Sequence, residues 1–443
     1  MARWTTRASC GSGANMSASD TAKPAHGPDV ARSIFAVDGS DLMVGGVAVR
    51  SIVEHVGRPT FLYDGGILRA SYRALADALD GFAEIHYSVK ANPAKAIIAL
   101  FLSEGAGIEI ASIGEYRAAI AAGAAPERIL FAGPGKRRRE LEEVIADGIG
   151  EIHVESHEEI ERIEAIAAGL SLRVKISLRI NPMAEAQAGA MRMGGKPTAF
   201  GFCEEDLDPV FAQLAQCRQL DFVGVHIYGG TQILDAEALL NQWRHGIRIA
   251  GDIAARLGRP LETIDLGGGL GIPYYAGETP LDLAAFKAGL PELSALLAAD
   301  SNLAAARIVV EPGRFLTGPG GIYVAEVNAV KDVRGTLFVI TDGGMHHHLA
   351  ASGNLGQIIK RDYPIVAPAR MDEAPSMAAT IVGPLCTPLD TLARSALLPA
   401  LKAGDLIAVL QSGAYGPSAS PGNFLSHAPA AEVLVENGEV MIL

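Results

Sequence analysis

Two patterns of apolar and polar residues follow one another along the chain. From about Pro59, short runs rich in Val, Ile and Leu alternate with alanine-rich helical stretches, such as Glu204 to Cys217 and Asp235 to Leu257. After a leading strand at Phe61, eight strand-like runs begin at Ile85, Gly107, Ile129, Glu151, Lys175, Phe222, Thr263 and Arg307. Eight strand-helix units in series predict a closed (β/α)8 barrel, an α/β fold.

The pattern changes after about Phe315, where strand-like runs follow without amphipathic helices between them. These runs are Tyr323 to Val330, Leu337 to Thr341, Ala379 to Val382, Leu406 to Leu410, and Ala431 to Leu443. The segment Phe35 to Ile52 also alternates like a strand and could pair with them. We therefore predict a barrel over residues 58–316 and a discontinuous β domain made of residues 34–57 and 317–443.

Composition narrows the class of protein. At 443 residues and 49% hydrophobic content, the chain suits a two-domain globular protein. No apolar run approaches the roughly 18 residues of a membrane-spanning helix. The net charge of -13 argues against a nucleic-acid partner and does not suit an acidic carrier protein, which favours a free small molecule as substrate. Four scattered cysteines indicate a reducing, cytoplasmic setting.

The first residues differ from the rest. Residues 1–19 contain Arg3 and Arg7 but no acidic residue, and they lack the apolar core of a secretory signal. We interpret this stretch as an over-extended start, with Met16 as the initiator, although an organelle transit peptide would have a similar composition. We predict a disordered tail over residues 1–33.

Candidate chemistry is spread over three motifs. Lys90 ends the run His86 to Asn92, where burial would lower its pKa and make it a usable Schiff-base amine. Far downstream, Gly267 to Gly271 and Arg314 could hold a phosphate, and Glu311 could pair with a protonated ring nitrogen. Together these residues predict a pyridoxal-phosphate site, although Glu311 could also be a strand-end carboxylate paired with Arg314.

The predicted barrel brings these motifs to one face. In such barrels the active site lies at the C-terminal ends of the strands, with phosphate bound after the seventh and eighth. Lys90 ends the first predicted strand, and the glycines and Arg314 follow the seventh and eighth. Arg179 and Asn181 end the fifth, and His226 to Gln232 the sixth. His226 and Tyr228 point to the same side, so either ring could cover the cofactor.

Further candidates lie in the predicted β domain. Gly383 to Asp390 sets the Cys386 thiol near a carboxylate, where it could reprotonate a carbanion or be a small buried apolar residue. Tyr415 lies in a second glycine-containing loop. His346 to His348 suggest a metal, but adjacent residues on a strand face opposite sides, so we predict none.

Most of the chain, from about Phe35 to the C-terminus, resembles the fold type III pyridoxal-phosphate decarboxylases, which include diaminopimelate, ornithine and arginine decarboxylases. Tyr87 to Asn92, Asp265 to Tyr274 and Glu311 to Arg314 carry the resemblance. It implies an alanine racemase-like barrel plus β domain, and a homodimer in which Cys386 donates a proton across the interface. The implied cofactor-binding residues are Lys90, His226, Tyr228, Thr231, Gly267, Gly268, Gly269, Glu311, Gly313, Arg314 and Tyr415.

Departures from the family pattern bear on the substrate. Diaminopimelate decarboxylases usually carry Cys-Glu-Ser-Gly-Asp where this chain has Cys386 to Asp390. They also place an arginine, which binds the distal carboxylate of the substrate, after the motif that aligns with Asp342 to Met345. Here Ala350 and Ala351 follow, with no arginine before Arg361. The segments Met193 to Gly201, Tyr228 to Gln232 and Phe424 to His427 resemble a secondary-pathway subgroup acting on carrier-linked glutamate or associated with exosortase clusters.

These observations predict a decarboxylase that removes the α-carboxylate of an L-amino acid or of an amino-acid conjugate, a class that includes conjugates linked to a carrier protein. The alternatives are meso-diaminopimelate decarboxylase, an amino-acid racemase and a non-catalytic pyridoxal-phosphate-binding protein. Glu311 argues against a racemase, because the family's racemases place an arginine at the ring nitrogen, where it leaves a weaker electron sink. The β domain with Cys386 and Tyr415 argues against a binding protein.

Overall fold

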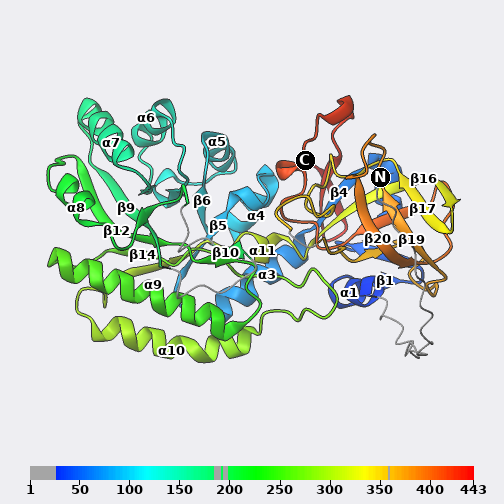
Figure 1. Cartoon of the computed structure of the whole chain (residues 1–443), viewed down its shortest axis with the longest axis horizontal. Coiled ribbons are helices and arrows are strands. Elements are labelled where there is room, and N and C mark those ends of the chain that lie inside the picture. The colour runs from blue at the N-terminus through cyan, green and yellow to red at the C-terminus, as the bar shows by residue number, and fades with distance from the viewer. Residues whose placement is uncertain (1–25, 184–190, 193–197, 358–359) are drawn as a thin grey trace, which may run out of the picture.

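A computed structural model describes residues 26–183, 191–192, 198–357 and 360–443. The proposed start at Met16 and residues 193–197 of the subgroup segment lie outside this part. Eight parallel strands form the barrel (Figure 1). They are β5 (Glu84–Ser88), β6 (Gly107–Ile110), β7 (Ile129–Phe131), β8 (Glu151–Val154), β9 (Val174–Asn181), β12 (Leu220–Ile227), β14 (Thr263–Asp265) and β15 (Arg307–Val310).

The barrel is closed, as predicted. β5 pairs with both β6 and β15, and β9 pairs with both β8 and β12, so the ring of strands has no free edge. Each strand begins within two residues of its predicted start. Because all eight strands run in the same direction, the residues that follow their C-terminal ends meet at one end of the barrel.

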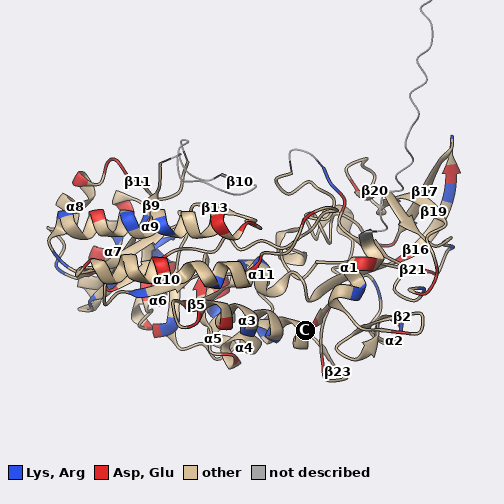
Figure 2. Cartoon of the chain, turned by 90° about the horizontal axis from the view of Figure 1, so that it is seen from below, with Lys and Arg blue, Asp and Glu red and all other residues tan. Residues whose placement is uncertain are grey.

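Helices wrap the outside of the barrel (Figure 1). Their side-chain caps explain several starts, because Asp64, Ser112, Ser156, Asp235 and Asp282 each accept a backbone N–H in the first turn. The helices are α3 (Gly65–Leu79), α4 (Lys95–Ser103), α5 (Ile113–Ala121), α6 (Arg138–Ala146), α7 (His157–Leu170), α8 (Asp208–Leu214), α9 (Ala236–Leu257), α10 (Leu283–Ala299) and the short α11 (Arg314–Thr317). Acidic and basic positions are interspersed along them (Figure 2).

The leading strand does not belong to the barrel. β4 (Thr60–Asp64) lies between β16 and β22 in the second large sheet, so placing residues 58–64 in the barrel domain was wrong. Local apolar spacing identifies a strand but not its partners. The sheet also contains β16 (Gly321–Val333), β17 (Thr336–Thr341), β18 (Ile365–Val366), β19 (Met377–Val382), β20 (Thr391–Leu398), β21 (Leu406–Val409), β22 (Ala431–Glu436) and β23 (Glu439–Ile442).

The last predicted strand, Ala431 to Leu443, is a hairpin of β22 and β23. Asn437 and Gly438 both have positive φ, 53° and 83°, as the tightest two-residue hairpin turns require. β20 was not predicted at all. Among the described residues, none of the helices has the length and apolarity that crossing a membrane requires.

The N-terminal segment packs on the β domain. α1 (His26–Ile34) is helical, so the predicted disordered tail was wrong for residues 26–33. It is followed by β1 (Val37–Asp38), β2 (Asp41–Val44), β3 (Val47–Ala48) and α2 (Val49–Val56). Phe35, Leu42 and Val49 share a buried cluster with Ile322 and Val433 of the second sheet. The segment therefore contributes to the core of the β domain.

Candidate active site

One cavity of about 950 Å³ opens at the C-terminal ends of the barrel strands and extends toward the β domain. Most of the predicted site residues line it, from sequence positions as distant as Lys90 and Tyr415. The lining includes Lys90, Glu109, Ala132, Gly133, Pro134, Arg179, Phe200, His226, Tyr228, Thr231, Gln232, Tyr274, Tyr275, Glu311, Arg314, Ala350, Gln357, Arg361, Tyr363 and Tyr415.

Lys90 lies in a 3-10 turn (Val89–Ala91) directly after β5, not in the strand itself. Its Nζ donates to Oε2 of Glu109 at 2.9 Å, and 44% of its side chain faces the open cavity. Burial opposes the charge, but Glu109 and Glu311 outweigh it and raise the pKa of Lys90. The expectation that burial lowers the pKa of Lys90 was therefore wrong: the two carboxylates favour its ammonium form.

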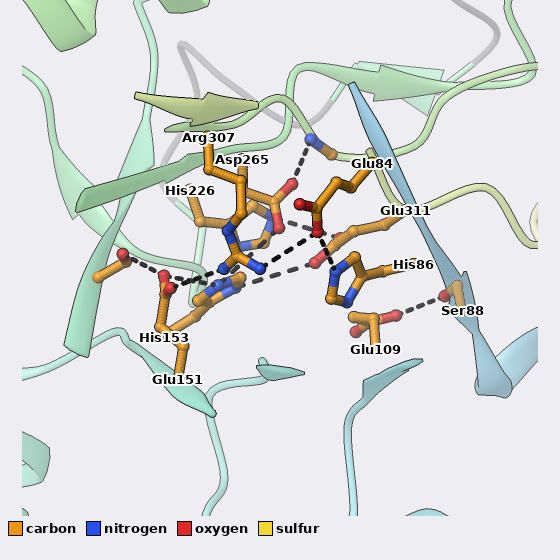
Figure 3. A network of polar contacts seen from close by, with 12 residues as sticks. Glu84, His86, Ser88, Glu109, Glu151, His153, His226, Asp265, Arg307 and Glu311 are labelled. Atoms are coloured by element: carbon orange, nitrogen blue, oxygen red, sulfur yellow. Dashed lines mark hydrogen bonds and ion pairs between the residues drawn. The ribbon is translucent and has the colours of Figure 1, made fainter. Parts of the chain in front are cut away.

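Glu311, directly after β15, is buried between two imidazoles (Figure 3). Its Oε2 lies 3.4 Å from Nε2 of His226, and its Oε1 lies 3.8 Å from Nδ1 of His153. Burial alone would raise the pKa of Glu311, but His226, Lys90 and His153 lower it well below its usual range. Asp265 lies beside this group, and burial together with Glu311 raises its pKa. The two pKa shifts run in opposite directions, so Glu311 is the carboxylate that the site favours in its ionised form.

The polar network continues through the interior of the barrel toward its opposite end (Figure 3). Nε2 of His153 lies 3.5 Å from Oε1 of Glu151, which also accepts the hydroxyl of Ser177. Arg307, partly exposed, contacts both Glu151 and Glu84 at 3.4 Å. The network lies inside the barrel, and His153 connects it to the Glu311 carboxylate.

The donor atoms of His153, His226, Asp265 and Glu311 lie within 4.8 Å of one another, a spacing that could also hold a metal ion. The sequence-based prediction of no metal did not consider this set, because it drew on His346 to His348 alone. His153, His226 and Asp265 come from three different strands and Glu311 directly follows a fourth, so no local motif indicates the group.

The glycine run forms a tight loop after β14. Gly267 and Gly269 have φ of 68° and 95°, and Oδ1 of Asp265 accepts the Gly267 N–H at 2.8 Å. A Cβ at Gly268 would lie 2.6 Å from the carbonyl oxygen of Glu311. Only glycine therefore lets this backbone approach the Glu311 segment so closely; the loop itself lies behind the residues that line the cavity.

Arg314 begins α11 beside this loop. Its Nη1 donates to the Tyr274 hydroxyl at 2.9 Å, and its guanidinium lies 4.7 Å from the ring centroid of Tyr415. Tyr415 is fixed in turn by its N–H, which donates to the Ala91 carbonyl next to Lys90 at 2.8 Å. Gly313 packs against Ala91, where an added Cβ would lie 2.8 Å away. Ala91 therefore contacts both the Tyr415 loop and the Gly313–Arg314 segment, directly beside Lys90.

His226 and Tyr228 occupy different places. His226 is almost fully buried against Glu311, whereas Tyr228 is half-buried with its ring in the cavity wall, 6.0 Å from the Arg179 guanidinium. Arg179 is itself paired with Glu155 at 2.8 Å. Of the two rings, Tyr228 therefore presents the larger face to a bound molecule.

Cys386 does not line the cavity of its own chain and is exposed. Its loop is built around the buried Asp390, whose carboxylate accepts the N–H groups of Met345 and Leu385 at 2.6 and 2.9 Å. Gly344 and Gly383 pack so closely on this carboxylate that a Cβ at either would clash with it. The loop is therefore a fixed platform that displays the thiol on the surface.

The three adjacent histidines lie in a turn, not on a strand, and all are buried. Nε2 of His347 donates to the Ala428 carbonyl at 2.8 Å, and Nε2 of His348 lies 2.9 Å from Oγ of Ser412. The His346 ring contacts the rings of His347 and His427, with centroids 3.8 and 4.7 Å away. These contacts give the run a packing role.

Residues 66–318 match the family model of the pyridoxal-binding domain of pyridoxal-dependent decarboxylases, more than half of the chain. The chain belongs to this family. L-glutamyl-[BtrI acyl-carrier protein] decarboxylase of Niallia circulans is 37% identical over 398 residues, covering 89% of this chain and 92% of that protein. Diaminopimelate decarboxylase of Pseudomonas aeruginosa is 32% identical, with 91% and 93% covered. The crystal structure of Helicobacter pylori diaminopimelate decarboxylase with L-lysine superposes with a TM-score of 0.78 at 30% identity, covering 89% of this chain and 95% of that one.

The predicted fold type, pyridoxal-phosphate cofactor and decarboxylase class are thereby confirmed, and the residues of the cavity fit the cofactor. Within the described structure, Oε1 of Glu311 and Nε of Arg314 are buried without a hydrogen-bond partner. Such atoms are costly to leave unpaired. A pyridinium N–H and a phosphate are groups that would satisfy them, and Lys90 lines the same cavity.

Proposed function

We propose that this decarboxylase acts on an aminoacyl conjugate of the L-glutamyl-carrier kind, whose far end carries no free carboxylate. The observation that carries this proposal is the cavity wall away from Lys90. Ala350 lines it, in the stretch where diaminopimelate decarboxylases are expected to place an arginine. Arg361 also lines it, but it pairs with Glu278 at 3.0 Å and lies over the Tyr275 ring. An uncharged chain end suits this wall better than a carboxylate.

We propose cofactor-binding roles for the residues of the site, which the geometry described above supports. Bound pyridoxal phosphate supplies an electron sink for the bond broken at the α-carbon. Lys90 would hold the cofactor covalently, and Glu311 would favour a proton on its ring nitrogen. The Gly267 to Gly269 loop, with Arg314 and Tyr415, would hold the phosphate, and Gly313 lets its segment pack against Ala91. Tyr228 would contact the ring, His226 contacts Glu311, and Thr231 lines the same cavity.

The α-carbon must regain a proton after carbon dioxide leaves. We assign this step to the Cys386 thiol of a second subunit, because the same residue of the first subunit lies outside its own cavity. The enzyme would then be a homodimer with shared sites. A cytoplasmic location, inferred from the scattered cysteines, belongs to the same proposal.

The test is carbon dioxide release from the pyridoxal-phosphate-loaded enzyme with carrier-linked L-glutamate, free glutamate, meso-diaminopimelate, lysine, ornithine and arginine. Turnover of the conjugate alone is the expected result. Turnover of diaminopimelate alone would refute the proposal. As a check on the site itself, Lys90→Ala should lose the visible absorption of lysine-bound cofactor.

Diaminopimelate decarboxylation is the second candidate, and Arg361 is the observation that favours it. If its side chain turned from Glu278 into the cavity, it could bind a distal carboxylate. In that case Arg361→Gln would raise KM for diaminopimelate at least tenfold, since a bidentate charge pair would be lost. The identity of 37% to the carrier-linked glutamate enzyme, against 32% to a diaminopimelate enzyme, supports the first proposal.

A further inference from the structure

Three consecutive arginines lie beside the mouth of the cavity. The loop after β7 contributes Ala132, Gly133 and Pro134 to the cavity wall, and Arg137, Arg138 and Arg139 follow it at the start of α6. A helix that follows a barrel strand begins at the end of the barrel where that strand ends, so these arginines lie on the active-site face. α6 is on the outside of the barrel, between α5 and α7 (Figure 1). All three side chains are exposed.

The loop itself is anchored without them. Nζ of Lys136, which is buried, donates to Glu159 at 2.6 Å and to the carbonyls of Gly133 and His153 at 2.8 and 2.6 Å. Lys136 therefore accounts for the shape of the cavity wall. The three arginines that follow it are not needed for that purpose.

Their position is unfavourable for the helix. The N-terminus of a helix carries partial positive charge, and its first residue is best an acceptor such as Ser or Asp. Here Arg137 is the N-cap; its N–H donates to Glu140 at 2.8 Å, but a guanidinium has no acceptor to return a bond to the helix. Three cations at this point oppose the helix dipole. Residues that break a local rule in this way are expected at functional surfaces.

Their charge is also poorly neutralised. On the helices beside α6, Arg117 of α5 is paired with Glu143, and Nη1 of Arg162 of α7 donates to the Lys136 carbonyl at 2.8 Å. Arg138 pairs with Glu142, one turn along its own helix. For Arg137 and Arg139, no carboxylate of the described residues lies within 4 Å of the guanidinium. Arg137 and Arg139 therefore keep their positive charge beside the mouth of the cavity, although Glu140, Glu142 and Glu143 follow on the same helix, in a chain whose net charge is -13.

We propose that Arg137, Arg138 and Arg139 form the docking surface for the acidic carrier protein that presents the substrate. The inference depends on the proposed function and names its partner. It also reverses the earlier argument from net charge: an acidic chain repels an acidic carrier everywhere except at this patch, so repulsion elsewhere and attraction here orient the carrier toward the cavity. The patch is contiguous with the cavity wall, where the carried group must enter.

The test uses the double charge reversal Arg137→Glu and Arg139→Glu. Acidic residues suit the start of a helix, so this variant should fold at least as well as the wild type. The matched control is Lys331→Glu with Lys402→Glu, which changes the charge equally on exposed residues of the β domain. Two readouts are needed: binding of the holo form of the BtrI acyl-carrier protein to each full-length enzyme, and KM for carrier-linked L-glutamate beside a short γ-thioester of glutamate without a carrier.

We expect the reversal to weaken carrier binding and raise KM for the carrier-linked substrate roughly tenfold or more, with less dependence on salt, and to leave the short thioester unaffected. The control should behave as wild type. Equal carrier binding by the wild type and the reversal, absence of carrier binding by the wild type, or an equal loss in the control would overturn the docking surface. Carrier binding that depends on the patch, without carbon dioxide release from either glutamyl substrate, would instead refute the proposed reaction and retain the surface.

Discussion

At the scale of single residues, the site combines motifs that the sequence reveals with partners that it does not. Lys90, Glu311 and Arg314 stand in recognisable local contexts and line one cavity. Glu109, which holds Lys90, and His153, which faces Glu311, come from other strands and share no motif with them. A signal did exist: Glu151 and His153 are two residues apart on one barrel strand, and alternate residues of such a strand point inward.

The ionisation of Glu311 should depend on both neighbouring imidazoles, but unequally. His226 lowers the pKa of Glu311 more than His153 does. We therefore expect His226→Gln to raise this pKa more than His153→Gln, with the larger loss of kcat/KM. Infrared absorption of the carboxyl group in the cofactor-free protein, compared with a Glu311→Gln reference, measures the pKa directly. If His153→Gln raised the pKa of Glu311 more than His226→Gln did, His226 would not be the main partner of the carboxylate.

His348 should make the protein less stable in mild acid. Its Nδ1 accepts the Ala351 N–H at 3.4 Å, so the ring must be neutral, and burial lowers its pKa from 6.5 to about 3. In the unfolded chain His348 binds a proton below about pH 6.5, whereas in the folded chain it binds one only below about pH 3. The free energy of unfolding should thus fall as pH drops through this window, by at most about 1.4 kcal/mol per pH unit for this group.

Urea unfolding of the cofactor-free protein at pH 7.5, 6.5 and 5.5 measures this effect. His348→Gln should be less stable at pH 7.5 but lose less stability on acidification. His346, whose pKa burial lowers to about 4, acts in the same direction and will retain part of the slope. An unchanged slope in the variant would show that His348 is not the titrating group.

At the scale of elements, prediction succeeded where the pattern is strictly local. Buried parallel strands read as short apolar runs bounded by turns, which is why all eight barrel strands were found. β20 was missed because Thr391–Leu398 places Arg394 and Ser395 in its exposed middle. α8 was predicted from residue 204, but it begins at Asp208 with Pro209 in its first turn, a position that proline favours.

The stability that α6 loses through the arginine at its N-cap can be measured directly. Replacing Arg137 with serine would supply the missing N-cap acceptor and remove one unfavourable charge. We expect a gain of about 1 kcal/mol in local stability, seen as slower amide hydrogen exchange in the first turn of α6. Arg137→Lys, which lacks an acceptor, is the control and should show no gain. A loss of protection in the serine variant would mean that the arginine stabilises the helix.

At the scale of the whole molecule, the exposed Cys386 predicts that two chains share each site. Mixing Lys90→Ala with Cys386→Ala subunits should restore activity to about a quarter of the wild-type value, since half of the dimers formed at random are mixed and each has one intact site. Each variant alone should be nearly inactive. If the mixture gains nothing after subunit exchange has been verified, the thiol does not act across the interface.

The course of synthesis gives β4 a particular significance. The ribosome makes β4 before the barrel. Its two partner strands, β16 and β22, are made only after the last barrel strand, and β16 follows β4 by about 250 residues. At 5–20 residues per second, β4 waits on the order of 10–50 s with both edges unpaired. The nascent barrel must therefore form with an open strand attached to its N-terminal side, and that strand is where a chaperone would be most needed.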